Sequence, residues 1–199
     1  ICNLAIADNG SGILPEMLPL TLCYAHGTHR DNPTDLGKFG MGGPGSARMI
    51  TDNYTIYSRV KGKEWYAVSY DHSKVKSGKW TDKQGRTIVP PAKPCELPSF
   101  VKGYFDDNYV NAEYGTVVVF ESPARLDNGF KTLKSCAEKL VRRLGETYPR
   151  HLETVDMFVD GVEVPMIDVT FLSPNGLHHD VGNGVFAESR GSKEIKVMV

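Results

Sequence analysis

The 199-residue sequence lacks several features by which classes of protein are recognised. Its four cysteines, Cys2, Cys23, Cys95 and Cys136, form no CxxC pair, which excludes the usual zinc spacings and is typical of reduced thiols in a cytosolic protein. No apolar run approaches the roughly 18 residues of a membrane-spanning helix, so we expect no membrane span. Because the formal charge is only −1, bulk electrostatics indicate neither nucleic acid nor a membrane surface as a partner.

Several catalytic and nucleotide-binding motifs are also missing. The sequence has no GxxxxGK[ST] run, and its glycines from Gly40 onward do not follow a strand, so the strand–GxGxxG–helix order of a dinucleotide fold is absent. Ser46 follows glycines, but GxSxG is not present, which argues against a hydrolase of that kind. His178 and His179 precede Asp180, yet neighbouring side chains on a strand point to opposite faces, which argues against a metal site there.

The composition is that of a soluble globular protein, with 40% hydrophobic and 24% charged residues. The length suits one ordinary domain, or one domain and part of a second. The sequence begins at Ile1 rather than at a methionine, and we therefore expect a fragment that is truncated at its N-terminus.

Hydrophobic periodicity predicts an α+β fold. Strands are predicted at residues 1–7, 54–60, 64–70 and 114–122, helices at 13–20, 44–50 and 133–144, and a hairpin at 155–167. Gly145 is expected to weaken or end the last helix, and Asp160-Gly161 to form the hairpin turn. A polar loop over residues 21–36 and an insertion over about 72–111, with one extra hairpin, complete the prediction.

Two glycine clusters are the most informative local features. In "LAIADNGSGI" an apolar run ends at Asp8 and passes through Gly10 and Gly12. A plain turn explains this string of turn-forming residues, but the acid could instead be aimed at a ligand. In "GKFGMG", Gly37 to Gly42, bare backbone amides precede a helix N-terminus, which is a suitable cradle for an anion.

The order of the motifs is more specific than either cluster alone. "DNGSGI" at Asp8–Ile13, "GKFGMG" at Gly37–Gly42 and Gly115-Thr116 at the start of a later strand resemble the Bergerat-fold (GHKL) ATP-binding superfamily. Its members include the gyrase B subunit, the ninety-kilodalton heat-shock chaperones, MutL, the microrchidia ATPases and sensor histidine kinases. The resemblance covers about the first 120 residues well. It implies a two-layer α/β sandwich with a mixed, mainly antiparallel sheet and helices on one face.

The resemblance also implies a role for each matching residue. Asp8 is expected to accept a hydrogen bond from the adenine amino group, Gly10 and Gly12 to let the purine approach, and Thr116 to hold the adenine directly or through a water. The phosphates are expected to lie against the loop formed by Gly37, Lys38, Phe39, Gly40, Met41 and Gly42. The segment of about residues 21–45 is the expected ATP lid, in which Arg30 or Lys38 is a candidate for contact with the γ-phosphate.

The catalytic part of the motif series is not found in this chain. In the superfamily a Glu that activates water, and an Asn that binds Mg²⁺, lie on a helix upstream of the DxGxG motif, and only seven residues precede Asp8 here. No catalytic or metal-binding residue is therefore assigned, and this chain is expected to lack ATP hydrolysis even if the intact protein performs it. ATP with Mg²⁺ is the expected ligand.

Three functions remain open. The first is a cytoplasmic ATPase in which nucleotide closes the lid and drives conformational change, with a possible homodimer and an unknown client. The second is a nucleotide-binding module without hydrolysis. The third, a histidine-kinase catalytic domain, is disfavoured because the chain continues well beyond the lid. Residues 1–167 are expected to form the ATP-binding domain, and residues 168–199 the start of a second, transducer-like region, as on the chaperone, microrchidia and MutL side of the superfamily.

Overall fold

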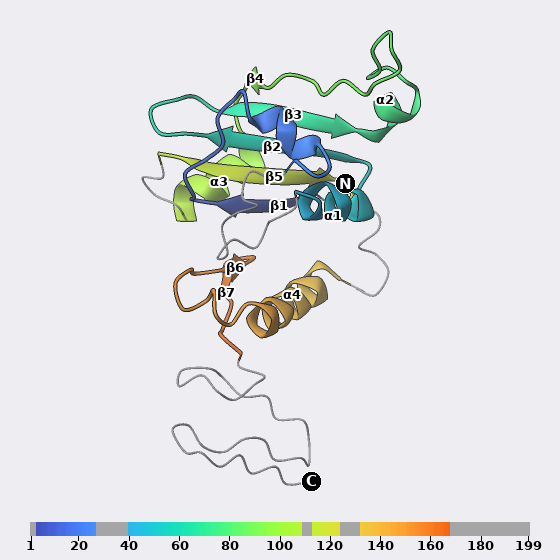
Figure 1. The fold of residues 1–199 in the computed structure, drawn as a ribbon. Coiled ribbons are helices and arrows are strands. Elements are labelled where there is room, and N and C mark those ends of the chain that lie inside the picture. Colours follow the sequence, from blue (N-terminus) through green and yellow to red (C-terminus); the bar gives the residue numbers. More distant parts are fainter. Residues whose placement is uncertain (1–2, 27–39, 109–112, 124–131, 168–199) are drawn as a thin grey trace. The chain divides into compact units, whose positions relative to one another are not determined.

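The structure is a computed structural model that describes residues 3–26, 40–108, 113–123 and 132–167 (Figure 1). The chain divides into two units, residues 1–128 and residues 129–199, and each is described here by itself. This division falls inside the domain expected over residues 1–167. The boundary expected after residue 167 concerns a segment outside the described residues and stays a prediction.

The first unit is built on a five-stranded sheet with the order β1-β5-β2-β3-β4. The strands are β1 (Asn3–Asp8), β2 (Asn53–Arg59), β3 (Tyr66–Asp71), β4 (Lys93–Pro94) and β5 (Gly115–Glu121). Each of these neighbours pairs in antiparallel fashion. The last strand of the unit is thus inserted between the first two, and the predicted α+β class with a mainly antiparallel sheet is confirmed.

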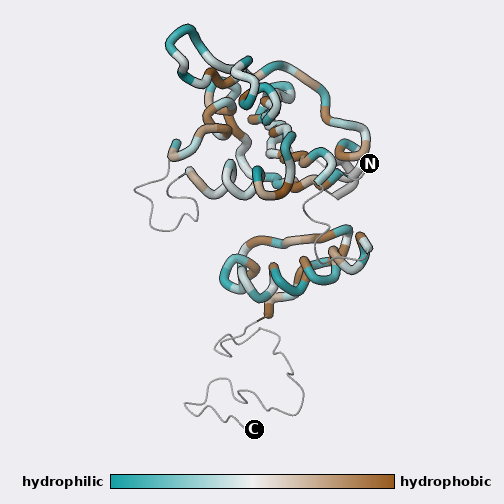
Figure 2. Tube along the Cα trace, turned by 90° about the vertical axis from the view of Figure 1, so that its right-hand side faces the viewer, coloured by the Kyte–Doolittle hydropathy of each residue, from teal (hydrophilic) through white to brown (hydrophobic). Residues whose placement is uncertain are grey.

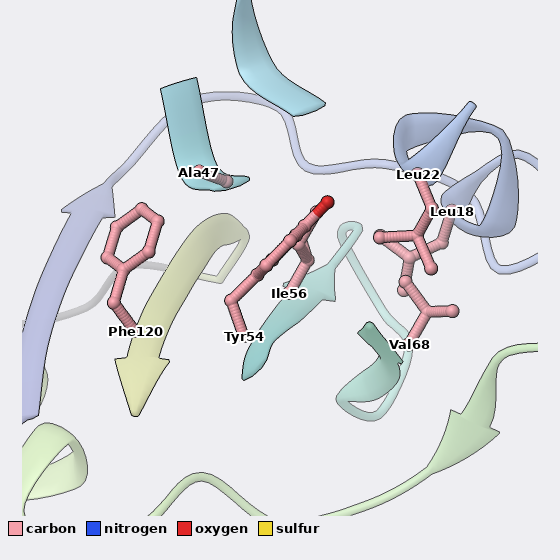
Figure 3. Close-up of a cluster of buried hydrophobic side chains, with 7 residues drawn as sticks. All are labelled: Leu18, Leu22, Ala47, Tyr54, Ile56, Val68 and Phe120. Atoms are coloured by element: carbon pink, nitrogen blue, oxygen red, sulfur yellow. The ribbon is translucent and has the colours of Figure 1, made fainter. Parts of the chain in front are cut away.

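One face of the sheet is covered by the 3-10 helix η1 (Leu18–Leu22) and the helix α1 (Gly42–Ile50). Side chains that alternate along the strands point to this face, as the two-residue period of a strand requires. Figure 3 shows Leu18, Leu22 and Ala47 from these helices against the strand residues, and the buried cluster comprises Leu18, Leu22, Ala47, Tyr54, Ile56, Val68 and Phe120. Figure 2 colours the chain by hydropathy and shows brown, hydrophobic stretches within the first unit.

The opposite face of the sheet is also covered. Leu97 and Val101, the latter from helix α3 (Ser99–Asn108), pack against Val117 and Val119 of β5. Because β5 is the middle of its three-strand neighbourhood and carries a continuous apolar run, both of its faces need cover. The structure therefore adds a second covered face to the expected two layers, and the insertion supplies it.

The insertion after β3 has more regular structure than the single extra hairpin that we expected. It contains the short helix α2 (His72–Lys76), a bridge between Thr81 and Thr87, strand β4 and helix α3. Asp71 caps α2 by accepting a hydrogen bond of 3.2 Å from the Lys74 amide. β4 extends the sheet by pairing with β3.

The segment that follows β1 is fixed against the end of β2. The Ile13 amide donates to Ser58 Oγ at 2.8 Å, and a Cβ added at Gly12 would lie 2.1 Å from the Arg59 carbonyl oxygen. The helix predicted over residues 13–20 is instead a turn followed by η1. Pro19 explains the difference, because it has no N–H to continue an α-helical ladder.

The second unit contains α4 (Leu133–Thr147) and a two-stranded hairpin, β6 (Phe158–Val159) and β7 (Val162–Glu163). Thr132 and Ser135 form a reciprocal capping box at the start of α4. The predicted hairpin turn is confirmed, with positive φ at Asp160 (51°) and Gly161 (77°).

Gly145, which we expected to weaken or end the helix, does not end α4. The helix continues to Thr147, and the glycine serves close packing, because a Cβ at this position would lie 2.3 Å from the Pro165 carbonyl oxygen. The Ile167 amide donates to the Gly145 carbonyl at 3.3 Å.

Across the residues that the structure describes, no helix combines the length and apolar character needed to cross a membrane. Cys23, Cys95 and Cys136 are free thiols and half-buried.

Gly12→Ala is predicted to destabilise the protein more than Gly62→Ala. Both glycines have φ of 74°, so both substitutions carry the left-handed backbone cost of about 1–2 kcal/mol. A Cβ at Gly62 meets nothing within 4 Å, whereas at Gly12 it meets the Arg59 backbone. Urea unfolding measures the two losses, and equal losses would contradict the close packing of Gly12.

Gly145→Ala and Gly103→Ala are predicted to have opposite effects on the free energy of unfolding. Both glycines lie within helices, where alanine is favoured by roughly 0.5–1 kcal/mol. A Cβ at Gly103 meets nothing within 4 Å, so this variant should be stabilised by about that amount. The Gly145 variant should be destabilised, because the Pro165 backbone must move. Thermal melts followed by circular dichroism check both signs.

Candidate functional site

A row of three polar residues crosses the sheet where β1 ends and β5 begins. Asp8 of β1 is opposite Thr116 of β5, and Thr116 is in turn opposite Ser58 of β2. Each lies an even number of residues along its strand from a member of the cluster under η1 and α1 (Leu4, Ile56 and Phe120, respectively, for Asp8, Ser58 and Thr116), so the three share the face covered by these helices. We refer to Asp8, Thr116 and Ser58 as the polar row.

Ser58 is the buried centre of the polar row and is only 1% exposed. Its Oγ accepts from the Ile13 amide and lies 3.0 Å from Thr116 Oγ1 and 3.1 Å from the Gly115 carbonyl oxygen. The single hydroxyl proton of Ser58 can go to only one of these two acceptors. If Ser58 donates to Thr116, the Thr116 proton is left for another partner; if Ser58 donates to Gly115, Thr116 can donate to Ser58 and its lone pairs are left. In both cases Ser58 holds the half-buried Thr116 hydroxyl in place.

Sequence reasoning missed Ser58. The signal was present, because a serine stands in "YTIYSRV" at a position that the alternation of the strand assigns to the buried face. A buried hydroxyl needs partners, and those partners come from segments 45 and 58 residues away in the chain.

Asp8 is exposed and already orientated by a local turn. Its Oδ1 accepts a 2.9 Å hydrogen bond from the Gly10 amide, which is the Asx-turn that the string of turn-forming residues suggested. Oδ2 accepts no hydrogen bond from any described residue, so one oxygen fixes the carboxylate and the other is available to a ligand.

The packing of the fold itself explains why residues 10 and 12 are glycines. A Cβ at Gly10 would lie 2.9 Å from Asp8 Oδ1, and one at Gly12 would collide with the Arg59 backbone. The close approach of a purine at these two glycines stays a prediction.

The glycines at the start of α1 differ in this respect. A Cβ at Gly42 or Gly43 meets nothing within 4 Å, so the described fold does not itself require glycine there. Gly40 has φ of 61°, in the left-handed region. Gly37, Lys38 and Phe39, which complete the predicted loop, lie outside the described residues, as do His29 and Arg30 of the expected lid.

The N-terminus of α1 is open. Its N-cap residue, Met41, makes no side-chain capping bond, and no acidic residue lies in the first turn. Pro44 has no N–H, which leaves the amides of Gly42 and Gly43 as the donors of that turn, and neither donates to a described residue. The helix dipole adds partial positive charge at the same place.

The C-terminal end of α1 is firmly held. Arg48 donates to the Thr51 carbonyl at 3.0 Å and to Asp52 Oδ1 at 2.6 Å, and its guanidinium lies 5.6 Å from the centre of the Tyr70 ring. Tyr70 stacks on Tyr54 at 5.2 Å. Burial, followed by the nearby Tyr70, raises the pKa of Tyr54 to about 12, so its phenol is neutral at physiological pH.

The polar row and α1 belong to the same face of the same sheet. Leu4 of β1 packs in the cluster that contains Ala47 of α1, and Asp8 lies four residues further along β1, roughly 13 Å away. Between them Ile6, on this face by the alternation of β1, is 57% exposed, so the face is open along its β1 edge. The arrangement suits a ligand that has a hydrogen-bond donor at one end, for Asp8, and an anionic group at the other, for the N-terminus of α1.

The described residues contain no group of three or more His, Cys, Asp or Glu side chains that could hold a metal ion. The sequence His178-His179-Asp180 lies outside those residues. The candidate site consists of hydrogen-bonding groups from β1, β2, β5 and the start of α1.

Comparison with known protein families gives a match for the first part of the sequence. No curated protein sequence matches the chain. The sequence model of the "Histidine kinase-, DNA gyrase B-, and HSP90-like ATPase" family matches residues 2–94. The match includes Asp8, both glycine clusters and the strands from β1 to β4, and it ends before Thr116. The chain thus carries, over residues 2–94, an ATP-binding domain of the histidine kinase-, gyrase B- and HSP90-like (GHKL) superfamily.

Proposed function

We propose that the polar row and the open start of α1 bind the two ends of one ATP molecule, as part of a GHKL-type ATPase that changes conformation with its nucleotide. The observation that carries the proposal is the alignment of Asp8 with Thr116 across β1 and β5, on the face that α1 covers. Residues from both ends of the first unit meet there, and residues 2–94 match the family.

Asp8 and Thr116 are proposed to read the adenine. The exocyclic amino group of adenine is a donor, and an ionised carboxylate is only an acceptor, so Oδ2 of Asp8 is a suitable partner. Thr116 can donate or accept, directly or through a water, according to where the Ser58 proton lies. Gly10 and Gly12 shape the turn that aims Asp8.

The phosphates are proposed to lie at the loop that leads into α1. The amides of Gly42 and Gly43 and the helix dipole favour an anion, and Gly37, Lys38, Phe39, Gly40 and Met41 belong to the same loop. Closure of a lid over about residues 21–45 then isolates the nucleotide from solvent. Mg²⁺ is expected to arrive with the phosphates, since the described residues supply no metal-binding cluster.

Hydrolysis of ATP is part of the proposed function, and no residue of this chain is assigned as its catalytic base. Cleavage needs such a base to position the attacking water. A binding module without hydrolysis is the alternative. Measurement of phosphate release by the intact protein separates the two, and a histidine kinase would be recognised by a phosphorylated histidine. Homodimerisation and a cytoplasmic location remain parts of the proposal.

Asp8→Asn is predicted to weaken ATP binding roughly 10- to 150-fold, the loss expected for a hydrogen bond to a charged group. The amide oxygen of Asn can still accept from the Gly10 amide, so the turn and the fold should persist. Calorimetric titration of the chain with ATP and Mg²⁺ measures the effect.

Asp82→Asn is the matched control for that prediction. Asp82 Oδ1 accepts from the Gln84 amide at 2.9 Å, the same two-residue turn at the same distance, but in the hairpin beyond β3. Asp82→Asn removes the same charge, together with the 2.7 Å ion pair between Asp82 and Arg86, and should leave ATP affinity unchanged. Unaltered binding by Asp8→Asn would remove Asp8 from the site, whereas no binding by the unmodified chain would count against the function itself.

The double variant Gly42→Ala/Gly43→Ala is predicted to separate phosphate binding from stability. Neither added Cβ meets protein atoms within 4 Å, so the melting temperature should not fall. At the proposed cradle, however, the methyl groups should obstruct the amides and lower ATP affinity at least roughly tenfold, while adenosine binds as before. Gly103→Ala, with an equally open Cβ in α3, is the control. Equal losses for ATP and adenosine would contradict a phosphate cradle here.

A further inference from the structure

The segment after β3 carries a local positive charge that the rest of the chain does not share. Residues 71–88 contain five lysine and arginine residues against two aspartates, a net charge of +3. The whole chain carries −1, so the remaining residues together carry −4. We refer to residues 71–88 as the basic arm.

The basic arm has a defined shape. Trp80 packs edge-on against Tyr70 of β3 at 6.2 Å, and Lys74 Nζ lies 6.0 Å from the centre of the Trp80 ring. Beyond Trp80 the chain forms a short hairpin, in which the Ile88 amide donates to the Trp80 carbonyl at 2.7 Å and the Asp82 amide donates to the Arg86 carbonyl at 2.8 Å. In Figure 1 the chain after α2 forms the uppermost loop, and Figure 2 shows it as a hydrophilic segment.

Both acidic residues of the basic arm form ion pairs with basic residues of the same arm. Asp71 forms an ion pair with Lys74 at 3.0 Å, and Asp82 forms one with Arg86 at 2.7 Å. Hydrogen bonds from Ser73 and Lys74 lower the pKa of Asp71 to about 2, so this acid is ionised at neutral pH.

Three cations of the basic arm are left without compensation. Lys76, Lys79 and Lys83 are exposed, and none of them forms an ion pair with any residue in the described part of the chain. They lie within eight residues of one another, on the short helix and the hairpin that follows it. Charges of both signs are ordinarily interspersed on a solvated surface, whereas these three lysines have no acidic side chain of the basic arm left to pair with.

We propose that the basic arm is a contact surface for the phosphate backbone of duplex nucleic acid, with Lys76, Lys79 and Lys83 as the phosphate-binding groups. Lysine ammonium groups on flexible stems suit a regular array of phosphates and neutralise it without reading sequence. This surface is independent of the proposed ATP site, because it uses none of the same residues.

The contacts that Trp80 makes within the protein favour a duplex over a single strand as the partner. Binding of single strands without sequence preference relies on aromatic rings that stack on bases, and Trp80 is half-buried between Tyr70 and Lys74. A membrane surface is less suitable, because Val75 and Trp80 are half-buried and only Ile88, at 50% exposed, offers a large exposed apolar side chain within the basic arm. A duplex needs only exposed positive charge on a projecting element.

The test compares two triple variants of the 199-residue chain that each remove three positive charges. Lys76→Gln/Lys79→Gln/Lys83→Gln alters the basic arm, and Lys63→Gln/Lys102→Gln/Lys134→Gln alters three exposed lysines elsewhere. Fluorescence anisotropy measures binding to a labelled DNA duplex of about 20 base pairs, at about 50 and 200 mM salt. Circular dichroism melts establish that both variants are folded.

Three neutralised phosphates predict a salt slope of about −2.7 for the unmodified chain, or roughly 40-fold weaker binding between the two salt concentrations. The basic-arm variant should lose at least roughly tenfold in affinity at low salt and most of the slope, and the control variant should stay within about twofold of the unmodified chain.

Three results would overturn the proposal. They are absence of duplex binding at low salt, equal losses in the two variants, and tighter binding to single-stranded DNA or to phosphatidylserine-containing vesicles than to the duplex. The last result would assign the basic arm to a different class of partner.

Discussion

The position of β5 between β1 and β2 is the constraint on which the site depends. It places Thr116 opposite Asp8 on one side and opposite Ser58 on the other. A slip of one residue would turn Thr116 to the other face and bring Val117, which is fully buried, to the row. The buried hydroxyl of Ser58 opposes such a slip, because its partners on β5 and at Ile13 would then be lost. The same register that orders the core therefore orders the groups proposed to read the base.

The glycines of the two motifs are used in different ways, although they look alike in the sequence. Gly12 admits the Arg59 backbone and Gly10 admits the Asp8 carboxylate, so both complete the protein's own packing. Gly42 and Gly43 have open space where a side chain would stand. No described residue requires glycine at this helix start, and the proposed phosphate site offers a reason for glycine there. The distinction lies in the surroundings of each residue and not in the local pattern.

Local sequence patterns predicted the elements that depend on nearby residues. The strand that ends at Asp8, the hairpin of β2 and β3, the helix from the second glycine cluster and the turn at Asp160-Gly161 follow from alternation and turn chemistry. Ser58 could not be assigned in this way, because its partners come from distant segments. Gly145 was misread for a similar reason, since the Pro165 carbonyl that excludes a side chain is 20 residues away. Helix α3 escaped prediction because its apolar pattern is weak and its role, to cover β5, is set by tertiary packing.

The separation in sequence between β1 and its partner has a consequence for biosynthesis. In the described sheet β1 pairs with β5 alone, and Asp8 and Thr116 are 108 residues apart. At the usual rate of translation, about 5–20 residues per second, β1 waits roughly 5–20 seconds before β5 has been made. During that interval β1 lacks its partner strand of the described sheet, and Leu4 has no finished core to pack against. β1 therefore completes its pairing only after β5 has been made, and a nascent chain is exposed to chaperones and proteases until then.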